Sequence, residues 1–411
     1  MEIRPIIATL RKHKLTAVLL TLQVAFTCAI VCNVAFMIIH RARRVSIPTG
    51  IAENQLSVIR VEGIRQDKNP QAQHQTDLAA LRAIPGVQTV VANDGSLPLS
   101  QSSSFYGVCP TKEALERAMQ VQSLGAACVQ AGVYTGSPGL IETLGLDLVE
   151  GRNFHEDEFV QDDDPPVAIV SQALAQRLYP GQNPLGKLLY TGAKNPIRVI
   201  GIVKTLLAAR LRTPGTDDYT MIFPQLPGSR MSALAYYVLR TAPQDREQVL
   251  HAAHDVLIKL DPNRIIGHMQ TYAQIRSAYF GRDRTMIGLL IASALGLLFV
   301  TALGITGLAN FWVQQRTRTI GIRRAIGATR GDILRYFQTE NFLIVGFGVL
   351  LGVLLAIGLN LLLMKHYELP RLPLWYLPVG AAALWLLGQL AVLAPALRAS
   401  RVQPVVATRS V

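Results

Sequence analysis

The sequence predicts an α-helical membrane protein with four transmembrane helices and a large mixed α/β domain inserted between helices 1 and 2. Half of the residues are hydrophobic and only 16% are charged, whereas a soluble protein usually carries about 25% charged residues. Four runs of 24 to 28 residues contain no charged side chain, and an α-helix needs roughly 20 apolar residues to cross a bilayer. The predicted spans are residues 15–39, 286–313, 341–364 and 372–397.

The spans also define the other segments of the chain. Gln23 and Asn33 lie within the first span, where uncharged polar groups typically hydrogen bond between helices. No span contains a charged residue, so the sequence offers no ion or proton pathway through the bilayer. The remaining segments are an N-terminal segment (1–14), the inserted domain (40–285), a loop (314–340), a short loop (365–371) and a C-terminal tail (398–411).

The positions of the charged residues predict the orientation in the membrane. Residues 1–14, 314–340 and 398–411 together carry thirteen basic and three acidic residues, whereas the domain over 40–285 has a net charge of only +2. Short basic segments stay in the cytoplasm, and long domains cross the membrane largely regardless of charge. The basic residues directly after the first span are the exception. We therefore expect cytoplasmic termini and an external domain, and the net charge of +13 then indicates topology rather than nucleic-acid binding.

The external domain has strand and helix patterns at both ends. Leu56–Val61 alternates like a strand, Thr76–Ala83 suits a helix, and Gln88–Ala92 suits a second strand. A similar strand–helix–strand unit covers Ala235–Met269. Because these two units can share one sheet, we expect two lobes, with residues from about 100 to 200 forming the inserted lobe.

Two pairs of cysteines lie in different surroundings. Cys28 and Cys32 lie within the first span and are expected to pack against other helices. Cys109 and Cys128 lie in the external domain, where a disulfide is permitted. The sequence leaves both states of this second pair open, bonded and free.

No pattern in the chain predicts catalysis. Gly181–Leu188 nearly matches a phosphate-binding loop, but Leu188 stands where a hydroxyl should hold Mg²⁺, and Pro184 removes a backbone amide. His251 and His254 share a helix face without a third ligand, so we expect solvated histidines. The sequence therefore predicts no catalytic residue, no metal site and no cofactor bound by this chain.

The loop between the second and third spans alternates isoleucines with arginines. One interpretation is an amphipathic helix that rests on anionic membrane lipid. The other is a short helix that fits a groove on a cytoplasmic partner, with Gly321, Gly327 and Ala328 permitting close approach. The residues alone favour neither.

The loop contains the motif Arg316-Thr-Arg-Thr-Ile-Gly-Ile-Arg-Arg-Ala-Ile-Gly-Ala. This motif resembles the signature R-x-R-E-I-G-I-R-x-A-[LI]-G-A of MacB/FtsX-type ABC permeases, the type VII mechanotransmission group. Leu144–Phe154 and Val167–Lys187 resemble two motifs of the MacB-like periplasmic core domain, and the second of these accounts for the apparent phosphate-binding loop. Leu10–Leu15 resembles the segment that leads into the first span of the family's members, and Pro395–Arg409 resembles their C-terminal tail. The resemblance therefore covers nearly the whole chain.

The resemblance implies a mechanism in which the permease transmits movement. A separate cytoplasmic ABC ATPase would bind ATP and Mg²⁺, because this chain lacks the ATPase domain that is fused in MacB. A second permease subunit, identical or different, would complete the transporter in the bacterial inner membrane. The coupling residues that the resemblance assigns are Arg316, Arg318, Thr319, Gly321, Ile322, Arg323, Arg324, Ala325, Gly327, Ala328 and Glu340.

Two positions in the loop bear on pairing. The family's usual Glu is Thr319 here, which suggests pairing with a different permease, although neutral drift also accounts for it. Glu340 matches the family's acidic residue after the loop, where an arginine of the loop can pair with it.

Three functions remain open at this level. The first is export of a peptide, siderophore or drug through a tripartite efflux assembly with a periplasmic adaptor and an outer-membrane channel. The second is mechanotransmission without export, in lipoprotein extraction or activation of a cell-wall hydrolase. The third is a membrane receptor, which would need a cytoplasmic output domain that residues 314–340 are too short to supply.

Overall fold

The computed structural model describes residues 14–63, 70–102, 104–161, 164–193, 195–212, 215–226, 234–367 and 373–401. The chain divides into two compact units. The first combines the N-terminal helix with the residues from Arg282 onward, and the second is Ile47–Gly281.

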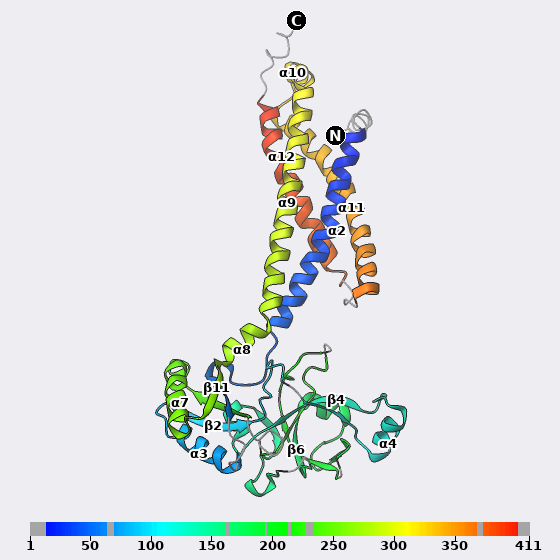
Figure 1. Cartoon of the computed structure of the whole chain (residues 1–411). Helices are drawn as coiled ribbons and strands as arrows, with labels where there is room; N and C mark the ends of the chain where they lie inside the picture. The colour runs from blue at the N-terminus through cyan, green and yellow to red at the C-terminus, as the bar shows by residue number, and fades with distance from the viewer. Residues whose placement is uncertain are drawn as a thin grey trace. The chain divides into compact units, whose positions relative to one another are not determined.

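Four helices of the first unit are long and apolar enough to span a membrane, and they are the only such helices in the described part of the chain. At 1.5 Å per residue, each exceeds the roughly 30 Å of hydrocarbon that it must cross. They are α2 (Lys14–Val45), α9 (Gly281–Gln315), α11 (Arg330–Tyr367) and α12 (Tyr376–Ser400) (Figure 1).

The helix ends correct the predicted segment boundaries. The first three helices extend beyond the charge-free runs, so the folded domain is narrower than the predicted 40–285. A helix can continue past the hydrocarbon where its long basic side chains reach water. Beyond the charge-free runs, Arg41 of α2 also pairs with Asp283 of α9. The last helix begins at Tyr376 rather than 372, after a turn in which its amide donates to the carbonyl of Pro373.

Small residues set the packing of the membrane helices. A Cβ added to Gly352 of α11 would lie 2.5 Å from the Cβ of Cys28 and 2.7 Å from the carbonyl oxygen of Ala25, both on α2. The glycine therefore lets the two backbones approach closely, as small residues do in membrane proteins. Cys28 and Cys32 are buried and free, which agrees with the predicted packing role.

Polar side chains join the membrane helices. The hydroxyls of Thr27 and Thr301 lie 2.8 Å apart, between α2 and α9. Asn33 Nδ2 donates to the carbonyl of Ala356 on α11 at 3.1 Å, and Gln23 Nε2 donates to the carbonyl of Val300 at 3.4 Å. The predicted role of Gln23 and Asn33 as links between helices is therefore confirmed.

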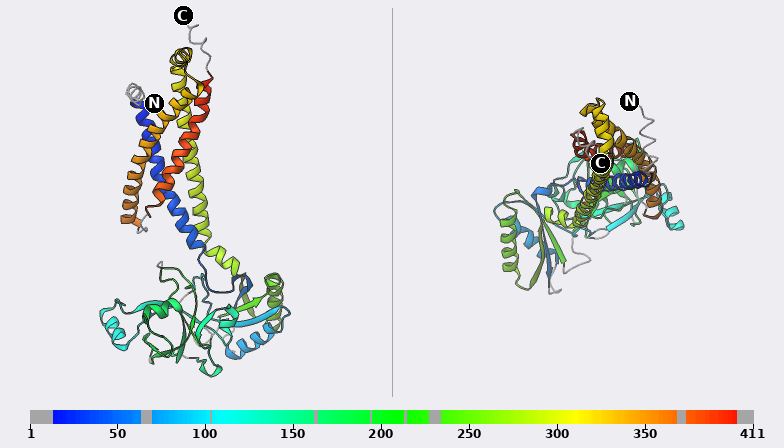
Figure 2. Two further views of the ribbon diagram at one scale, coloured as in Figure 1. Left: turned by 180° about the vertical axis from the view of Figure 1, so that it is seen from behind. Right: turned by 90° about the horizontal axis from the view of Figure 1, so that it is seen from above.

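The second unit contains a small antiparallel sheet with the order β11-β1-β10-β2. Helices α3 and α7 lie side by side against one face of it (Figure 2), and their apolar side chains form one core with Ile59, Tyr237 and Leu239 of the sheet. The elements are β1 (Leu56–Gly63), β2 (Val87–Asn93), β10 (Leu234–Thr241), β11 (Arg264–Thr271), α3 (Pro70–Arg82) and α7 (Arg246–Leu260). Segments from both ends of the domain thus share a sheet.

A seven-stranded mixed sheet forms the inserted lobe, with the order β3-β4-β9-β6-β8-β5 and β7 beside β8. Its strands are β3 (Ser104–Val108), β4 (Val129–Thr135), β5 (Leu148–Gly151), β6 (Val167–Ser171), β7 (Leu188–Leu189), β8 (Ile197–Val203) and β9 (Thr220–Phe223). The other elements of the unit are α4 (Lys112–Val121), α5 (Leu140–Leu144), α6 (Gln172–Leu178), α8 (Tyr272–Tyr279), η1 (Glu53–Gln55) and η2 (Glu156–Glu158). The Sγ atoms of Cys109 and Cys128 are bonded across α4.

A shared apolar core joins the two lobes. Leu56 and Val238 of the small sheet are buried together with Tyr134, Ile169 and Ile222 of the large sheet. At the edge of this core, the Ser137 amide donates to the Ala92 carbonyl at 2.8 Å, and the Ala92 amide donates to the Ser137 hydroxyl at 3.0 Å. The edge strand β2 of the small sheet is thereby fixed to a loop of the other lobe.

Candidate functional site

The predicted coupling loop contains a short helix, α10 (Thr317–Ala325), between α9 and α11. Gly327 ends it with φ +108°. The Gly327 amide donates to the Arg324 carbonyl at 3.2 Å, and the Ala328 amide donates to the Arg323 carbonyl at 3.1 Å. This is the hydrogen-bond pattern of a Schellman motif, which needs a left-handed residue that glycine adopts without strain.

The next helix begins with a reciprocal cap. The Asp332 amide donates to the Thr329 hydroxyl at 3.2 Å, and the Asp332 carboxylate accepts from the Thr329 amide at 3.0 Å. The loop is therefore a defined turn between two helices. The Schellman motif that ends α10 at Gly327 and the N-terminal cap of α11 at Thr329 lie only a few residues apart.

One face of α10 packs inside its own unit. Ile320 and Gly321 are buried, as are Ile333 and Phe337 of α11. The Arg323 guanidinium lies 5.0 Å from the centre of the Tyr336 ring. Gly321 is therefore packed within this chain, whereas one of the two interpretations of the loop placed it against a partner.

A buried ion pair joins the two ends of the loop. Arg316 Nη1 lies 2.8 Å from Glu340 Oε2, and the Glu340 side chain is only 1% exposed. The predicted pairing of Glu340 with an arginine of the loop is confirmed. Glu340 Oε1 is buried and has no hydrogen-bond partner among the described residues. The Arg316 guanidinium also lies 5.8 Å from the Trp312 ring, so it is held on two sides.

The opposite side of α10 exposes an apolar pair, Ile322 and the C-cap residue Ile326. Ile326 is 82% exposed and Ile322 is 48% exposed, one turn apart on the same helix face. No heavy atom lies within 4 Å of a Cβ added to Gly327, so its neighbourhood is open. The predicted site residues on the exposed side are Arg318, Thr319, Ile322, Arg323, Ala325 and Gly327, while Arg324 and Ala328 are half-buried.

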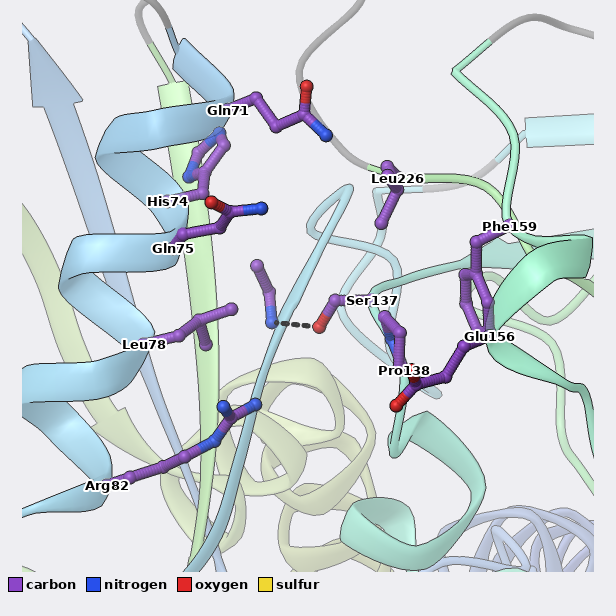
Figure 3. Close-up of a pocket in the computed structure, with 11 residues that line it drawn as sticks. Gln71, His74, Gln75, Leu78, Arg82, Ser137, Pro138, Glu156, Phe159 and Leu226 are labelled. Carbon is purple, nitrogen blue, oxygen red and sulfur yellow. Dashed lines mark hydrogen bonds between the residues drawn. The ribbon is translucent and has the colours of Figure 1, made fainter.

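A second candidate site is a cleft of about 430 Å³ between the two lobes of the external domain (Figure 3). Helix α3 supplies one wall with glutamine, histidine and arginine side chains. The opposite wall comes from the Ser137–Pro138 turn and from the region of η2. The lining residues are Gln71, His74, Gln75, Leu78, Arg82, Ala92, Ser137, Pro138, Glu156, Phe159 and Leu226. No local sequence pattern predicts this site, because its walls are far apart along the chain.

A buried polar network lies behind the α3 wall. Tyr237 donates its hydroxyl hydrogen to Asp77 at 2.7 Å, and Asp77 also pairs with Arg264 at 2.9 Å. Burial raises the pKa of Tyr237 and lowers the pKa of His74, whose Nδ1 lies 3.0 Å from the Tyr237 hydroxyl. Among the described residues, no group of three or more His, Cys, Asp or Glu side chains is placed to hold a metal.

Two family models match this chain. The model described as the MacB-like periplasmic core domain matches residues 24–267, and that described as the FtsX-like permease C-terminal matches residues 291–404. Together with the four apolar helices, these matches define a multi-pass membrane protein with a periplasmic domain, of the ABC transporter permease class. The chain belongs to the MacB-like periplasmic core domain family and carries the FtsX-like permease region of MacB/FtsX permeases.

Curated relatives agree with this family. The ABC transporter permease YknZ of Bacillus subtilis is 23% identical over 351 residues, which is 82% of this chain and 78% of that protein. The macrolide export ATP-binding/permease protein MacB of Rhodospirillum rubrum is 32% identical over 257 residues, which is 59% of this chain and 38% of that protein. The chain thus spans well under half of the length of that MacB.

Two solved structures resemble this chain with low TM-scores. The extracellular domain of the transporter YknZ, from Gram-positive bacteria, is 16% identical, covers 51% of this chain and 100% of that chain, and gives a TM-score of 0.32. The periplasmic region of MacB from Actinobacillus actinomycetemcomitans is 16% identical, covers 57% of this chain and 97% of that chain, and gives a TM-score of 0.35.

Proposed function

We propose that this chain is a permease subunit that couples ATP hydrolysis by a separate cytoplasmic ATPase to movement of its own periplasmic domain. The observation that carries the proposal is the exposed apolar face of α10, formed by Ile322 and Ile326. An exposed isoleucine pair on a helix between two membrane spans is suited to contact with another protein.

The placement of the face supports an ATPase as that protein. The periplasmic domain lies between the first two spans, so a loop between the second and third spans emerges on the opposite side of the membrane. The basic excess of this loop and of both terminal segments agrees with a cytoplasmic location. The termini then lie in the cytoplasm as well.

The chemistry of the face defines its partner. Arg318 and Arg323 are exposed on the same short helix as the two isoleucines. A complementary groove would have an apolar floor for Ile322 and Ile326 and acidic residues at its rim. ATP and Mg²⁺ bind to that partner in this proposal, and this chain holds no cofactor.

The route for transmitted movement is built into the loop. The pair formed by Arg316 and Glu340 fixes the end of α9 to α11, so a force on α10 passes to both helices. Helix α9 begins at Gly281, where the periplasmic domain ends along the chain. No charged residue lies in the predicted spans, which favours mechanical transmission over a transport path through the bilayer.

Export is the favoured outcome of this movement. Relatives named as macrolide export proteins match the chain over 54–75% of its length. We extend the proposal to a second permease subunit, with Thr319 at the position that distinguishes the two permease subunits. We also extend it to a periplasmic adaptor with an outer-membrane channel.

An aspartate at the apolar face tests the ATPase contact. The chain is purified from its native membranes in mild detergent, and the ATP hydrolysis associated with it is measured for wild type and for Ile326→Asp. We expect the variant to remain in the membrane and to lose most of this activity, because a charge replaces the apolar contact. Ile265→Asp is the matched control, since Ile265 is a 54% exposed isoleucine of the periplasmic domain.

Two results would contradict the proposal. One is ATP hydrolysis by the chain after it has been purified free of any other protein. The other is full associated activity in Ile326→Asp. Labelling of Ile326→Cys and Ile265→Cys in intact cells with a membrane-impermeant thiol reagent tests the orientation separately, and only Ile265→Cys should react once the outer membrane is permeabilised.

A further inference from the structure

The cleft between the lobes of the periplasmic domain has the dimensions of a ligand site. Its volume is about 430 Å³, and sites for small molecules usually have about 300–1,000 Å³. Polar side chains of α3 line one wall of the cleft, and apolar side chains, including Phe159 and Leu226, lie on the opposite wall (Figure 3). A ligand that fits both walls carries polar groups along an aliphatic frame.

The network behind α3 fixes the hydrogen-bonding role of one lining residue. Tyr237 donates its only hydroxyl hydrogen to Asp77, so His74 Nδ1 must donate to the Tyr237 oxygen that lies 3.0 Å away. Burial lowers the pKa of His74 and keeps the ring neutral near pH 7. Nε2 of His74 is then a hydrogen-bond acceptor on a residue that lines the cleft.

Opposite charges enter the cleft from its two walls. Arg82 extends from α3, and Glu156 extends from η2 on the facing wall (Figure 3). Both side chains are exposed, and neither forms an ion pair within the described segments. One wall therefore offers a cation and the other an anion.

We propose that this cleft binds a small zwitterion of amino-acid chemistry, either a free amino acid or a short peptide with both ends free. Arg82 binds the carboxylate and Glu156 binds the ammonium group, while His74 Nε2 and the Gln75 amide bind the polar remainder. A single ligand then contacts both lobes and ties them together. Such binding goes beyond ATPase coupling and does not depend on it.

Equilibrium dialysis of the full-length chain in lipid nanodiscs tests this proposal. The probes are radiolabelled glutamine and the tripeptide Ala-Gln-Ala, each in free, N-acetylated and C-amidated form. We expect saturable binding of a free form and weaker binding of both blocked forms. The probe with the higher affinity, glutamine or tripeptide, identifies which of the two sources fits the cleft.

Two variants assign each end of the ligand. Arg82→Gln should weaken binding of the free form about threefold and leave binding of the C-amidated form unchanged, because exposed ion pairs are weak. Glu156→Gln should likewise weaken binding of the free form about threefold and leave binding of the N-acetylated form unchanged. A misfolded domain would lower all of these affinities together, so the selective pattern reports contact with the ligand.

Matched controls come from α4, which does not line the cleft. Arg117→Gln and Glu113→Gln make the same charge changes at exposed positions and should leave binding unchanged. The proposal is overturned if neither free probe binds saturably, if blocked and free forms bind equally, or if the control variants weaken binding as much. None of these results affects the ATPase contact, which is measured on α10.

Discussion

The guanidinium of Arg316 and the carboxylate of Glu340 form a buried ion pair that closes the loop between α9 and α11. The residues lie 24 positions apart in sequence, yet their side chains are 14% and 1% exposed. A buried charge is tolerated only when it is paired and hydrogen bonded. The pair therefore fixes where α9 ends relative to α11, and with it the placement of α10.

Removing one partner of this pair should destabilise the membrane unit. Glu340→Ala leaves the Arg316 cation buried without its counter-charge, and we expect a loss of about 3 kcal/mol in the free energy of unfolding. Unfolding in mixed detergent micelles, followed by circular dichroism, measures it. Arg318→Ala removes an exposed arginine of the same loop and should change stability by less than about 0.5 kcal/mol. Equal effects of the two variants would contradict a structural role for the pair.

Gly327 should be sensitive to substitution because of its backbone rather than its surroundings. Its φ of +108° excludes most side chains, although a Cβ there would meet nothing within 4 Å. We expect Gly327→Ala to cost about 1 kcal/mol or more. Gly331→Ala is the control, because Gly331 lies inside α11, where alanine is favoured. The same unfolding assay compares them, and a neutral Gly327→Ala would argue against the Schellman turn.

The membrane helices and the turn between α10 and α11 could be predicted because their signals are local. Charge-free runs and the glycine of the turn are visible in short stretches of sequence. The helix ends were less accurate, since α2 continues through Arg41, Arg43 and Arg44 to Val45. The first charged residue in the sequence marks where the hydrocarbon ends. The length of a helix also depends on ion pairs beyond that point, such as that between Arg41 and Asp283.

Much of the large sheet and the whole cleft could not be predicted in this way. Strand β9 is short and fully buried, and β4 is nearly all buried, so both lack the alternation that identifies a half-buried strand. The cleft depends on how two lobes pack, which places Arg82 and Glu156 on facing walls. No local pattern in the sequence carries that information.

Gly352 should be essential for packing of α11 against α2. A Cβ at this position would lie 2.5 Å from Cys28 Cβ, whereas a Cβ at Gly358 of the same helix would meet nothing within 4 Å. We expect Gly352→Ala to separate the helices and lower the unfolding free energy by about 1–3 kcal/mol. Gly358→Ala should be neutral or slightly stabilising. Reversal of this order in the micelle unfolding assay would show that the two helices do not pack closely at Gly352.

The ion pair between Asp77 and Arg264 should matter more when it is broken than when it is replaced. Both side chains are 2% exposed, so Asp77→Leu leaves a buried guanidinium and should cost about 3–5 kcal/mol. The double variant with Arg264→Met should be more stable than Asp77→Leu alone, because no buried charge remains. Pulse proteolysis of the full-length chain in urea measures both. A double variant that is less stable than the single one would mean that Arg264 finds other partners.

The neutral state of His74 should make the stability of the periplasmic domain depend on pH. Burial lowers the pKa of His74 below its ordinary value of 6.5, against a smaller opposing effect of Asp77 and with a smaller contribution from Arg264 in the same direction. As the pH falls below about 6.5, the unfolded chain gains a proton that the folded histidine does not take up until its own, lower pKa is reached. The unfolded state then binds more protons, so the free energy of unfolding decreases in this window.

A substitution that cannot titrate isolates this contribution. His74→Phe should show a smaller loss of stability between pH 7 and pH 5 than the wild type, in pulse proteolysis at a series of pH values. His251→Phe, at an exposed position of α7, serves as the control and should retain the wild-type dependence. If His74→Phe keeps the full dependence, the acid sensitivity arises elsewhere and the neutral ring between Tyr237 and the cleft is not its cause.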